Sequence, residues 1–234
     1  MFRAAAQEFS NLAAEAVREH GRFNVALSGG STPRSLYALL TTGAVPVPWE
    51  KVSVFWGDER HVPPDDPESN YRMANEAMLS KVSVLPGNIF RIEGEAKDAK
   101  AAAAKYEKTL VSFFDLDPGE FPRFDIILLG LGPDGHTASL FPDSAALQEN
   151  RRLVVANWVE KFHADRITLT LPVLNNAAEV IFLVSGAEKA GILHQVLEGC
   201  AGKFPSQLVR PNDGKLMWLL DRDAASDLRP ANST

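Results

Sequence analysis

The chain has 234 residues, of which 45% are hydrophobic and 23% are charged, the composition of an ordinary globular protein. Its net charge of -6 argues against nucleic-acid binding, because there is no basic excess to meet phosphate backbones. A single cysteine, Cys200, excludes an internal disulfide and a cysteine-rich metal site, and there is no apolar run of about 18 residues to span a membrane.

Residues 1–20 predict an amphipathic helix that ends at Gly21. The apolar residues recur at helical spacing, and Glu8 and Glu15 interrupt the apolar centre that a signal peptide would need. We therefore expect a cytoplasmic protein.

Short apolar strands then alternate with helices. Strands are expected at residues 23–27, 52–56, 124–129, 153–156, 167–171, 180–184 and 216–220. Helices are expected to end near residues 40 and 197 and to span 71–79 and 97–114; residues 62–70 predict a loop, and residues 227–234 a frayed tail. This alternation predicts one α/β domain over residues 1–234, with a mostly parallel sheet and helices on both of its faces.

The turn after the first strand has the composition of an anion-binding site. It reads Ser28-Gly29-Gly30-Ser31-Thr32-Pro33, with two glycines that expose backbone N–H groups and a helix that starts next to them. The alternative is a plain strand-to-helix turn in which Ser31 or Thr32 caps the helix. Lys189, at the start of a later helix, can supply a charge to the same anion.

A charged cluster, Asp58-Glu59-Arg60-His61, follows the second strand. It suits a solvated loop, a metal site or a substrate-orienting group. His61 with Asp65 or Asp66 provides too few ligands for a metal, so we expect none. Arg60 is better suited to a bidentate contact with a phosphate or carboxylate.

Arg166, at the start of a strand, is placed like Arg60, although pairing with the neighbouring Asp165 would also account for it.

The stretch after the strand at 124–129 carries the strongest functional signal. Gly130, Gly132 and Gly135 fall within six residues, and Asp134 and His136 lie on either side of Gly135. Ligands of open α/β sheets bind beyond the carboxyl ends of strands, so this turn predicts a catalytic or binding site. A structural loop histidine is the alternative. Residues 137–141 are expected to start a short helix.

As a set, these motifs resemble 6-phosphogluconolactonase, over about residues 23–223. The motifs are Leu27-Ser28-Gly29-Gly30-Ser31-Thr32-Pro33, Trp56-Gly57-Asp58-Glu59-Arg60, Ser69-Asn70-Tyr71, Gly130-Leu131-Gly132-Pro133-Asp134-Gly135-His136-Thr137-Ala138-Ser139-Leu140-Phe141-Pro142, Arg166-Ile167-Thr168-Leu169-Thr170 and Ser185-Gly186-Ala187-Glu188-Lys189-Ala190. The resemblance implies a Rossmann-like doubly wound sheet, shared with glucosamine-6-phosphate deaminase. It also implies hydrolysis of 6-phosphogluconolactone in the oxidative pentose phosphate pathway, without a metal or organic cofactor, by a monomer or small homo-oligomer.

The same resemblance assigns roles to residues. His136 is similar to the family's general base, and Asp58 and Asp134 resemble acids that either orient it or bind sugar hydroxyls. Arg60 and Lys189 look like phosphate ligands, together with the turn at residues 28–32. Gly132 and Arg166 complete the expected substrate-binding set. N–H groups of the turn at residues 130–135 are expected to stabilise the oxyanion.

Two other functions stay open on this fold, a sugar-phosphate deaminase or isomerase and a non-catalytic sugar-phosphate sensor. Retention of His136 and Asp134 counts against the sensor. The deaminase pattern has a Glu immediately before the Pro that follows its histidine, where this chain has Phe141. It also has Tyr where this chain has Arg60. Both differences favour the lactonase.

Overall fold

A five-stranded parallel sheet forms the centre of the protein in a computed structural model that describes residues 1–229. The strand order is β2-β1-β4-β7-β8, which is 2-1-3-4-5 when the strands of this sheet are counted along the chain. This is a doubly wound order, so the predicted fold class is confirmed. The strands are β1 (Phe23–Leu27), β2 (Val52–Trp56), β4 (Ile126–Leu129), β7 (Glu179–Val184) and β8 (Lys215–Leu220).

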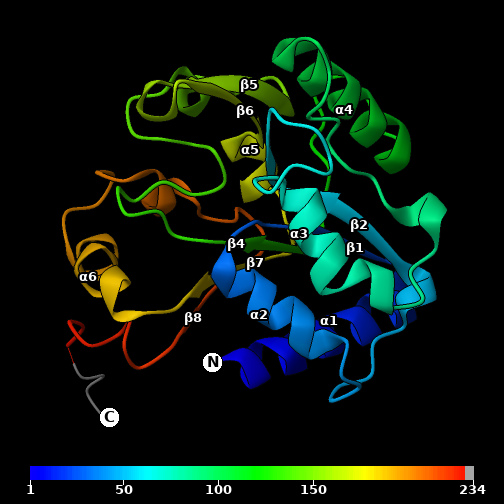
Figure 1. The fold of residues 1–234 in the computed structure, drawn as a ribbon, viewed down its shortest axis with the longest axis horizontal. Helices are drawn as coiled ribbons and strands as arrows, with labels where there is room; N and C mark the ends of the chain where they lie inside the picture. Colours follow the sequence, from blue (N-terminus) through cyan, green and yellow to red (C-terminus); the bar gives the residue numbers. More distant parts are fainter. Residues whose placement is uncertain (230–234) are drawn as a thin grey trace.

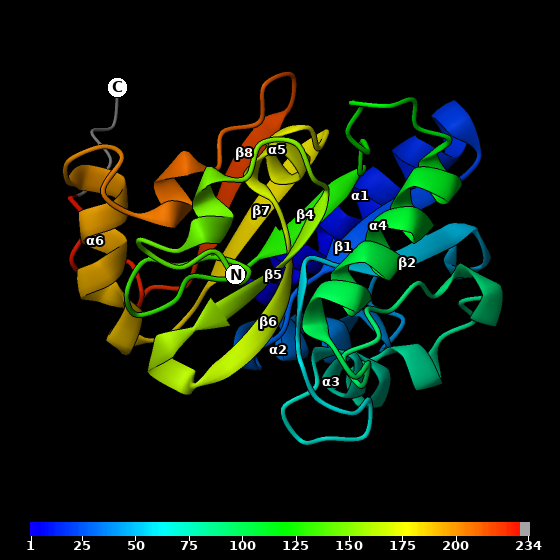
Figure 2. The same cartoon turned by 90° about the horizontal axis from the view of Figure 1, so that it is seen from above.

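Both faces of this sheet are covered by helices. Figures 1 and 2 show α1 (Phe2–His20) and α2 (Ser31–Leu40) on one face, and α4 (Ala99–Phe114) and α5 (Leu171–Asn175) on the other. Coverage on both faces explains why β1, β2, β4 and β7 are buried along their whole lengths. The remaining helices are α3 (Asn70–Ala77) and α6 (Ala190–Glu198).

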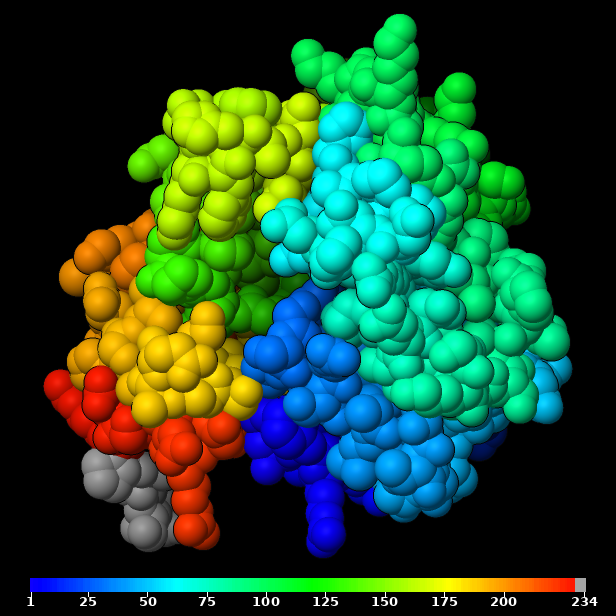
Figure 3. Space-filling view, in the orientation of Figure 1, coloured from blue at the N-terminus to red at the C-terminus, as the bar shows by residue number. Residues whose placement is uncertain are grey.

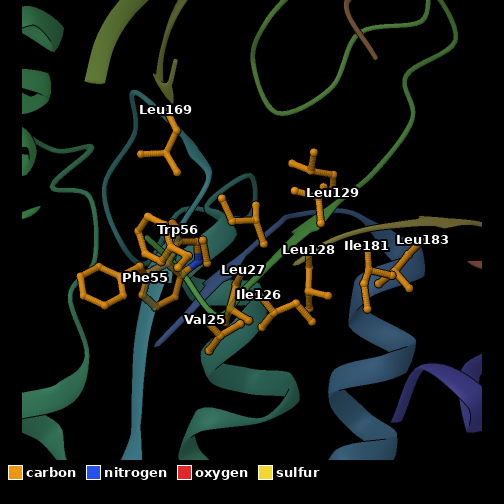
Figure 4. Packing of buried hydrophobic residues seen from close by; sticks show 14 of the residues in the cluster. Val25, Leu27, Phe55, Trp56, Ile126, Leu128, Leu129, Leu169, Ile181 and Leu183 are labelled. Atoms are coloured by element: carbon orange, nitrogen blue, oxygen red, sulfur yellow. The ribbon is translucent and has the colours of Figure 1, made fainter. Parts of the chain in front are cut away.

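The core between these layers is aliphatic around β4 and aromatic around β2 (Figure 4). The ring of Phe55 is stacked on Phe90 at 4.8 Å and meets Phe124 edge-on at 5.3 Å. Such buried aromatic pairs contribute about 0.5–1.5 kcal/mol beyond the area they bury. They hold the central strands, and therefore the turns that follow them, in fixed positions.

A second sheet, which the sequence did not predict, lies on the α4 side. It is antiparallel, with the order β3-β6-β5, and consists of β3 (Asp58–Arg60), β5 (Val154–Val159) and β6 (Ala164–Leu169). A solvated loop was one of the three interpretations that the sequence left open for residues 58–61. Three of these residues instead form a strand whose polar side chains line a cleft.

Two local expectations are wrong. Residues 137–141 form no helix: Thr137 and Leu140 make an isolated antiparallel bridge, and Ala138 has a φ of 46°. The residue that caps α2 is Gly30, and neither Ser31 nor Thr32 provides a side-chain cap in the structure of residues 1–229. The first N–H groups of α2 are therefore free to meet a ligand.

The end of the chain packs against the body of the protein as far as it is described. Leu228 contacts the core, and the Arg229 N–H donates to Glu198 at 2.9 Å. The remainder of the predicted frayed tail, residues 230–234, lies outside the described residues. Across residues 1–229, no helix has the length and apolar character needed to cross a membrane.

Candidate active site

A cleft opens where the turns after β1 and β4 meet. These strands are neighbours, and the chain leaves them in opposite directions, from β1 toward β2 and from β4 toward β7. Such a switch point is where open α/β sheets bind ligands. The cavity there has a volume of about 240 Å³, and Figure 3 shows the hollow near the centre of the face.

His136 lies in this cavity and is hydrogen-bonded to Asp134. Its Nδ1 contacts Asp134 Oδ1, and the second oxygen of that carboxylate lies 3.8 Å from Lys161 Nζ. Partial burial alone would raise the pKa of Asp134, but the hydrogen bond and charge of His136 outweigh burial and hold that pKa below its ordinary value. An ionised Asp134 fixes the proton on Nδ1 and leaves Nε2 to accept one.

The imidazole of His136 is held between a glycine and an aromatic ring. A Cβ on Gly132 would lie 2.0 Å from Nδ1, so no larger residue fits beneath the ring. Phe141 is also stacked on the ring, with centroids 4.1 Å apart. Gly132 also stabilises the turn, because its N–H donates to the His136 carbonyl at 2.8 Å.

Asp58 occupies a different position from Asp134. Its Oδ2 accepts a hydrogen bond from Ser139 Oγ at 2.6 Å, and its Oδ1 lies 3.3 Å from Asn70 Nδ2. In the described part of the chain it makes no hydrogen bond to His136. Asp134 is therefore the residue that orients the imidazole, and Asp58 is a buried wall of the cleft.

The sequence alone did not reveal the role of Asn70. Its Nδ2 also donates to the Asp58 carbonyl at 2.9 Å, and its side chain packs directly on the backbone of Gly29. A Cβ at Gly29 would lie 1.8 Å from Asn70 Oδ1, so this close approach requires a glycine. The only signal was the position of Asn70 inside the Ser-Asn-Tyr motif.

Glu59 joins the small sheet to α3. The buried carboxylate accepts hydrogen bonds from the N–H groups of Arg60, Asn70 and Tyr71. Burial raises its pKa, and these N–H donors oppose the shift without cancelling it. By fixing its two neighbours, Asp58 and Arg60, Glu59 holds one wall of the cleft in place.

Three basic side chains surround the cleft. Lys189 Nζ donates to the Leu131 carbonyl at 2.8 Å, and Arg60 donates to the Glu68 carbonyl. Arg166 lies over the ring of Phe162 at 5.3 Å. Within residues 1–229 none of the three forms a salt bridge, and the alternative pairing of Arg166 with the Asp165 carboxylate is not observed. Their charges are available to an anionic ligand.

The cleft continues beyond the central cavity at both ends. A smaller cavity of about 120 Å³ is lined by the start of α2 and by Lys189. In it, Thr32 Oγ1 and Ser185 Oγ form a hydrogen bond of 2.7 Å. A further cavity of about 340 Å³ contains Arg166 and Phe162. The central cavity shares lining residues with each of the other two cavities.

The structure brings together every residue that the sequence predicted for the site. The central cavity is lined by Ser28, Gly29, Gly30, Asp58, Arg60, Gly132, His136 and Lys189; Ser31 and Thr32 line the smaller cavity, and Arg166 the larger one. Asp134 reaches the site through His136. Phe162 is an addition that no sequence pattern indicated, and the only signal for Ser139 was its position inside the motif at residues 130–142.

Metal binding finds no support from this geometry. Among residues 1–229, no three His, Cys, Asp or Glu side chains converge as metal ligands would. The His61 ring is hydrogen-bonded to the Ala96 carbonyl at 2.6 Å. The absence of a metal or cofactor stays a prediction.

Fold and site together define a doubly wound α/β protein with an acid-paired histidine in a cationic cleft. The family described as glucosamine-6-phosphate isomerases/6-phosphogluconolactonase matches residues 1–218, and the chain belongs to this family. A 6-phosphogluconolactonase of Synechocystis sp. is 45% identical over 218 residues, which cover 92% of this chain and 89% of the relative.

Solved structures agree with this assignment. The 6-phosphogluconolactonase of Trypanosoma brucei is 32% identical, with a TM-score of 0.85 and coverage of 97% of this chain and 94% of that one. A monomeric glucosamine-6-phosphate deaminase matches with a TM-score of 0.76 at 23% identity and 97% coverage of both chains, which shows a shared fold only.

Proposed function

We propose that this protein is a 6-phosphogluconolactonase, which hydrolyses 6-phospho-D-glucono-1,5-lactone to 6-phospho-D-gluconate in the oxidative pentose phosphate pathway. The observation that carries the proposal is His136, oriented by Asp134 in a cleft with three cationic side chains that lack salt bridges within residues 1–229. Relatives with this name match nearly the whole chain. The proposal implies a small phosphorylated substrate that carries no charge at the carbon that reacts.

In this proposal His136 is the general base. With Nδ1 committed to Asp134, Nε2 accepts a proton from water as the water oxygen attacks the lactone carbonyl carbon. The carbonyl oxygen becomes an oxyanion. When it collapses, the bond from the carbonyl carbon to the ring oxygen breaks, and His136 returns its proton to that oxygen. The products are a hydroxyl group and a carboxylic acid, which ionises.

The substrate phosphate would be held at the start of α2. N–H groups of the Gly-Gly-Ser-Thr turn and the positive end of a ten-residue helix face the cavity that also contains Lys189. Arg60 also lines the central cavity. This arrangement supports the predicted phosphate ligands Lys189, Arg60 and residues 28–32.

Asp58 would act on the sugar rather than on His136. It is only 7% exposed, and its hydrogen bonds from Ser139 and Asn70 hold its carboxylate on the wall of the cavity. A carboxylate in this position can accept a hydrogen bond from a sugar hydroxyl.

The deaminase alternative is less well supported. Phe141, which stands where that pattern has a proton-transferring Glu, is stacked on His136 and can neither donate nor accept a proton. Ring opening and amine loss need repeated proton transfers, while lactone hydrolysis needs one activated water and a stabilised oxyanion. The sensor alternative leaves the oriented His136–Asp134 pair without a use.

The test is the decay of freshly prepared 6-phosphogluconolactone, followed by acid release at constant pH. Wild-type protein should raise the rate far above the spontaneous rate, and the non-phosphorylated gluconolactone should react much more slowly. Decay at the spontaneous rate over a range of protein concentrations would contradict the proposal.

A further inference from the structure

Arg60 and Arg166 lie directly opposite each other in the small antiparallel sheet. β3 and β6 pair in a register that matches Asp58 with Thr168, Glu59 with Ile167 and Arg60 with Arg166. Like charges at directly opposed positions of two strands destabilise the pair. This unfavourable pairing suggests that the combined positive charge of the two arginines has a function.

Within residues 1–229 no carboxylate forms a salt bridge with either guanidinium. Arg60 donates to the Glu68 carbonyl, and Arg166 lies over Phe162 with one long contact of 3.5 Å to the Asp165 carbonyl. Burial, and then the charge of Arg60, lower the pKa of Arg166, and the charges of Asp58, Glu68 and Glu59 oppose this shift without cancelling it. An anion placed between them would relieve this repulsion.

Arg166 lies apart from the proposed phosphate site, whereas Arg60, proposed above as a phosphate ligand, lines both regions and can contact an anion in either. Arg166 lines the 340 Å³ cavity, which Lys189 does not reach, and Lys189 lines the central cavity, which Arg166 does not reach. Asp58, Arg60 and His136 line both cavities. His136 thus lies between two cationic regions, one at Lys189 and the other at Arg166.

Hydrolysis of a phosphorylated lactone produces a second anion. The substrate carries charge only on its phosphate, whereas the open product has a carboxylate at the carbon that water attacked. Two of the turn N–H groups, those of Gly132 and Gly135, already donate within the turn, to the carbonyls of His136 and Gly132, and cannot also meet this charge. The cationic side chains that line the cavity on the Arg166 side of His136 are the two arginines.

We infer that Arg60 and Arg166 form a second anion site, which binds the oxyanion of the transition state and then the carboxylate of the product. The inference rests on the lactonase function proposed above. The two guanidiniums can each donate to one carboxylate oxygen. Ser139 and the acidic residues Asp58 and Glu68 line the same cavity. The cleft then recognises a molecule with an anion at each end.

The test compares two ligands that differ only at this carbon. One is 6-phosphogluconate, and the other is glucitol 6-phosphate, which has a hydroxymethyl group in place of the carboxylate. Binding is measured by calorimetry for the wild type, Arg166→Gln, Arg166→Lys and Lys189→Ala. Arg18→Gln, an exposed change at the opposite end of the sheet, is the matched control.

Arg166→Gln should weaken 6-phosphogluconate binding by about tenfold or more, which is the loss expected for a charge-assisted hydrogen bond. The affinity for glucitol 6-phosphate should stay within about twofold of the wild-type value. Arg166→Lys should restore part of the lost affinity, and Lys189→Ala should weaken the binding of both ligands by the same factor. Lactone turnover should fall with the 6-phosphogluconate affinity.

Two results would overturn the inference. If Arg166→Gln weakens the binding of both ligands equally, the phosphate binds at the arginines. If it changes neither affinity, the pair of arginines binds no anion of this substrate. If the wild type binds neither ligand but speeds lactone decay, this inference fails and the lactonase function stands; if it also leaves lactone decay at the spontaneous rate, both fail.

Discussion

Replacing Gly132 with Ala should inactivate the enzyme while leaving its fold intact. The added Cβ would lie 2.0 Å from His136 Nδ1 and 2.1 Å from Cε1, where real contacts stay above 3.0 Å. The backbone at Gly132 is outside the left-handed region, so alanine meets no conformational penalty there. The whole effect of the substitution therefore falls on the imidazole.

The imidazole must move to make room for the new methyl group. Phe141 is stacked on the ring at 4.1 Å, and to reach an ordinary contact distance the ring must move by about 1 Å or rotate out of contact with Asp134. A displacement of that size in a reacting group costs about 10²-fold in rate, which corresponds to about 2.7 kcal/mol. We expect kcat to fall by about this factor, with a small change in KM.

Gly130→Ala is the matched control. It makes the same chemical change two residues away, at a position with no atom within 4 Å of the added Cβ. Lactone hydrolysis at constant pH gives the rates, and thermal unfolding with product binding shows that both variants are folded. A Gly132→Ala enzyme that keeps more than about a third of wild-type kcat, or a Gly130→Ala enzyme that loses as much, would refute the reasoning.

Three further predictions follow from the same structure. Lys189→Ala and Arg60→Ala should each weaken 6-phosphogluconate binding and reduce its salt dependence, and calorimetry that shows unchanged affinity in both would reject the phosphate assignment. Glu179 is 2% exposed and has one oxygen without a hydrogen bond in the described structure; burial, followed by the charge of neighbouring acids, raises its pKa. A folded-state pKa above the unfolded one means that stability is lost as pH rises through that interval, so Glu179→Gln should raise Tm by about 2–4 °C at neutral pH and by less near pH 4. Glucosamine 6-phosphate should release no ammonia with the wild type or with Phe141→Glu, and enzyme-dependent ammonia at a rate near that of lactone hydrolysis would favour the deaminase.

The central strands could be predicted from the sequence because each is a short apolar run with a turn signal at its end. The predicted ranges 23–27 and 52–56 coincide with β1 and β2. The turn at residues 130–136 could also be predicted as a functional turn, because closely spaced glycines around an acid and a histidine have few purely structural explanations. These features depend on local sequence alone.

The features that escaped prediction depend on contacts between distant segments. β3 is polar, and it becomes a strand only because β6, more than 100 residues later, pairs with it. Asn70 gains its role from an approach to Gly29 across the cleft, and the pairing of Arg60 with Arg166 is a matter of register. Residues 137–141 have the composition of a helix start, but Ser139 is drawn to Asp58, which holds this segment as an irregular turn.

The central claim is that His136, oriented by Asp134, activates the water that opens the lactone. The most direct measurement is the turnover of 6-phosphogluconolactone by His136→Gln at constant pH, with 6-phosphogluconate affinity measured on the same preparation. Turnover should fall by about 100-fold or more, the usual contribution of a general base, while product affinity stays within about threefold of the wild type. A variant that binds product normally and retains more than about a tenth of wild-type turnover would contradict the claim.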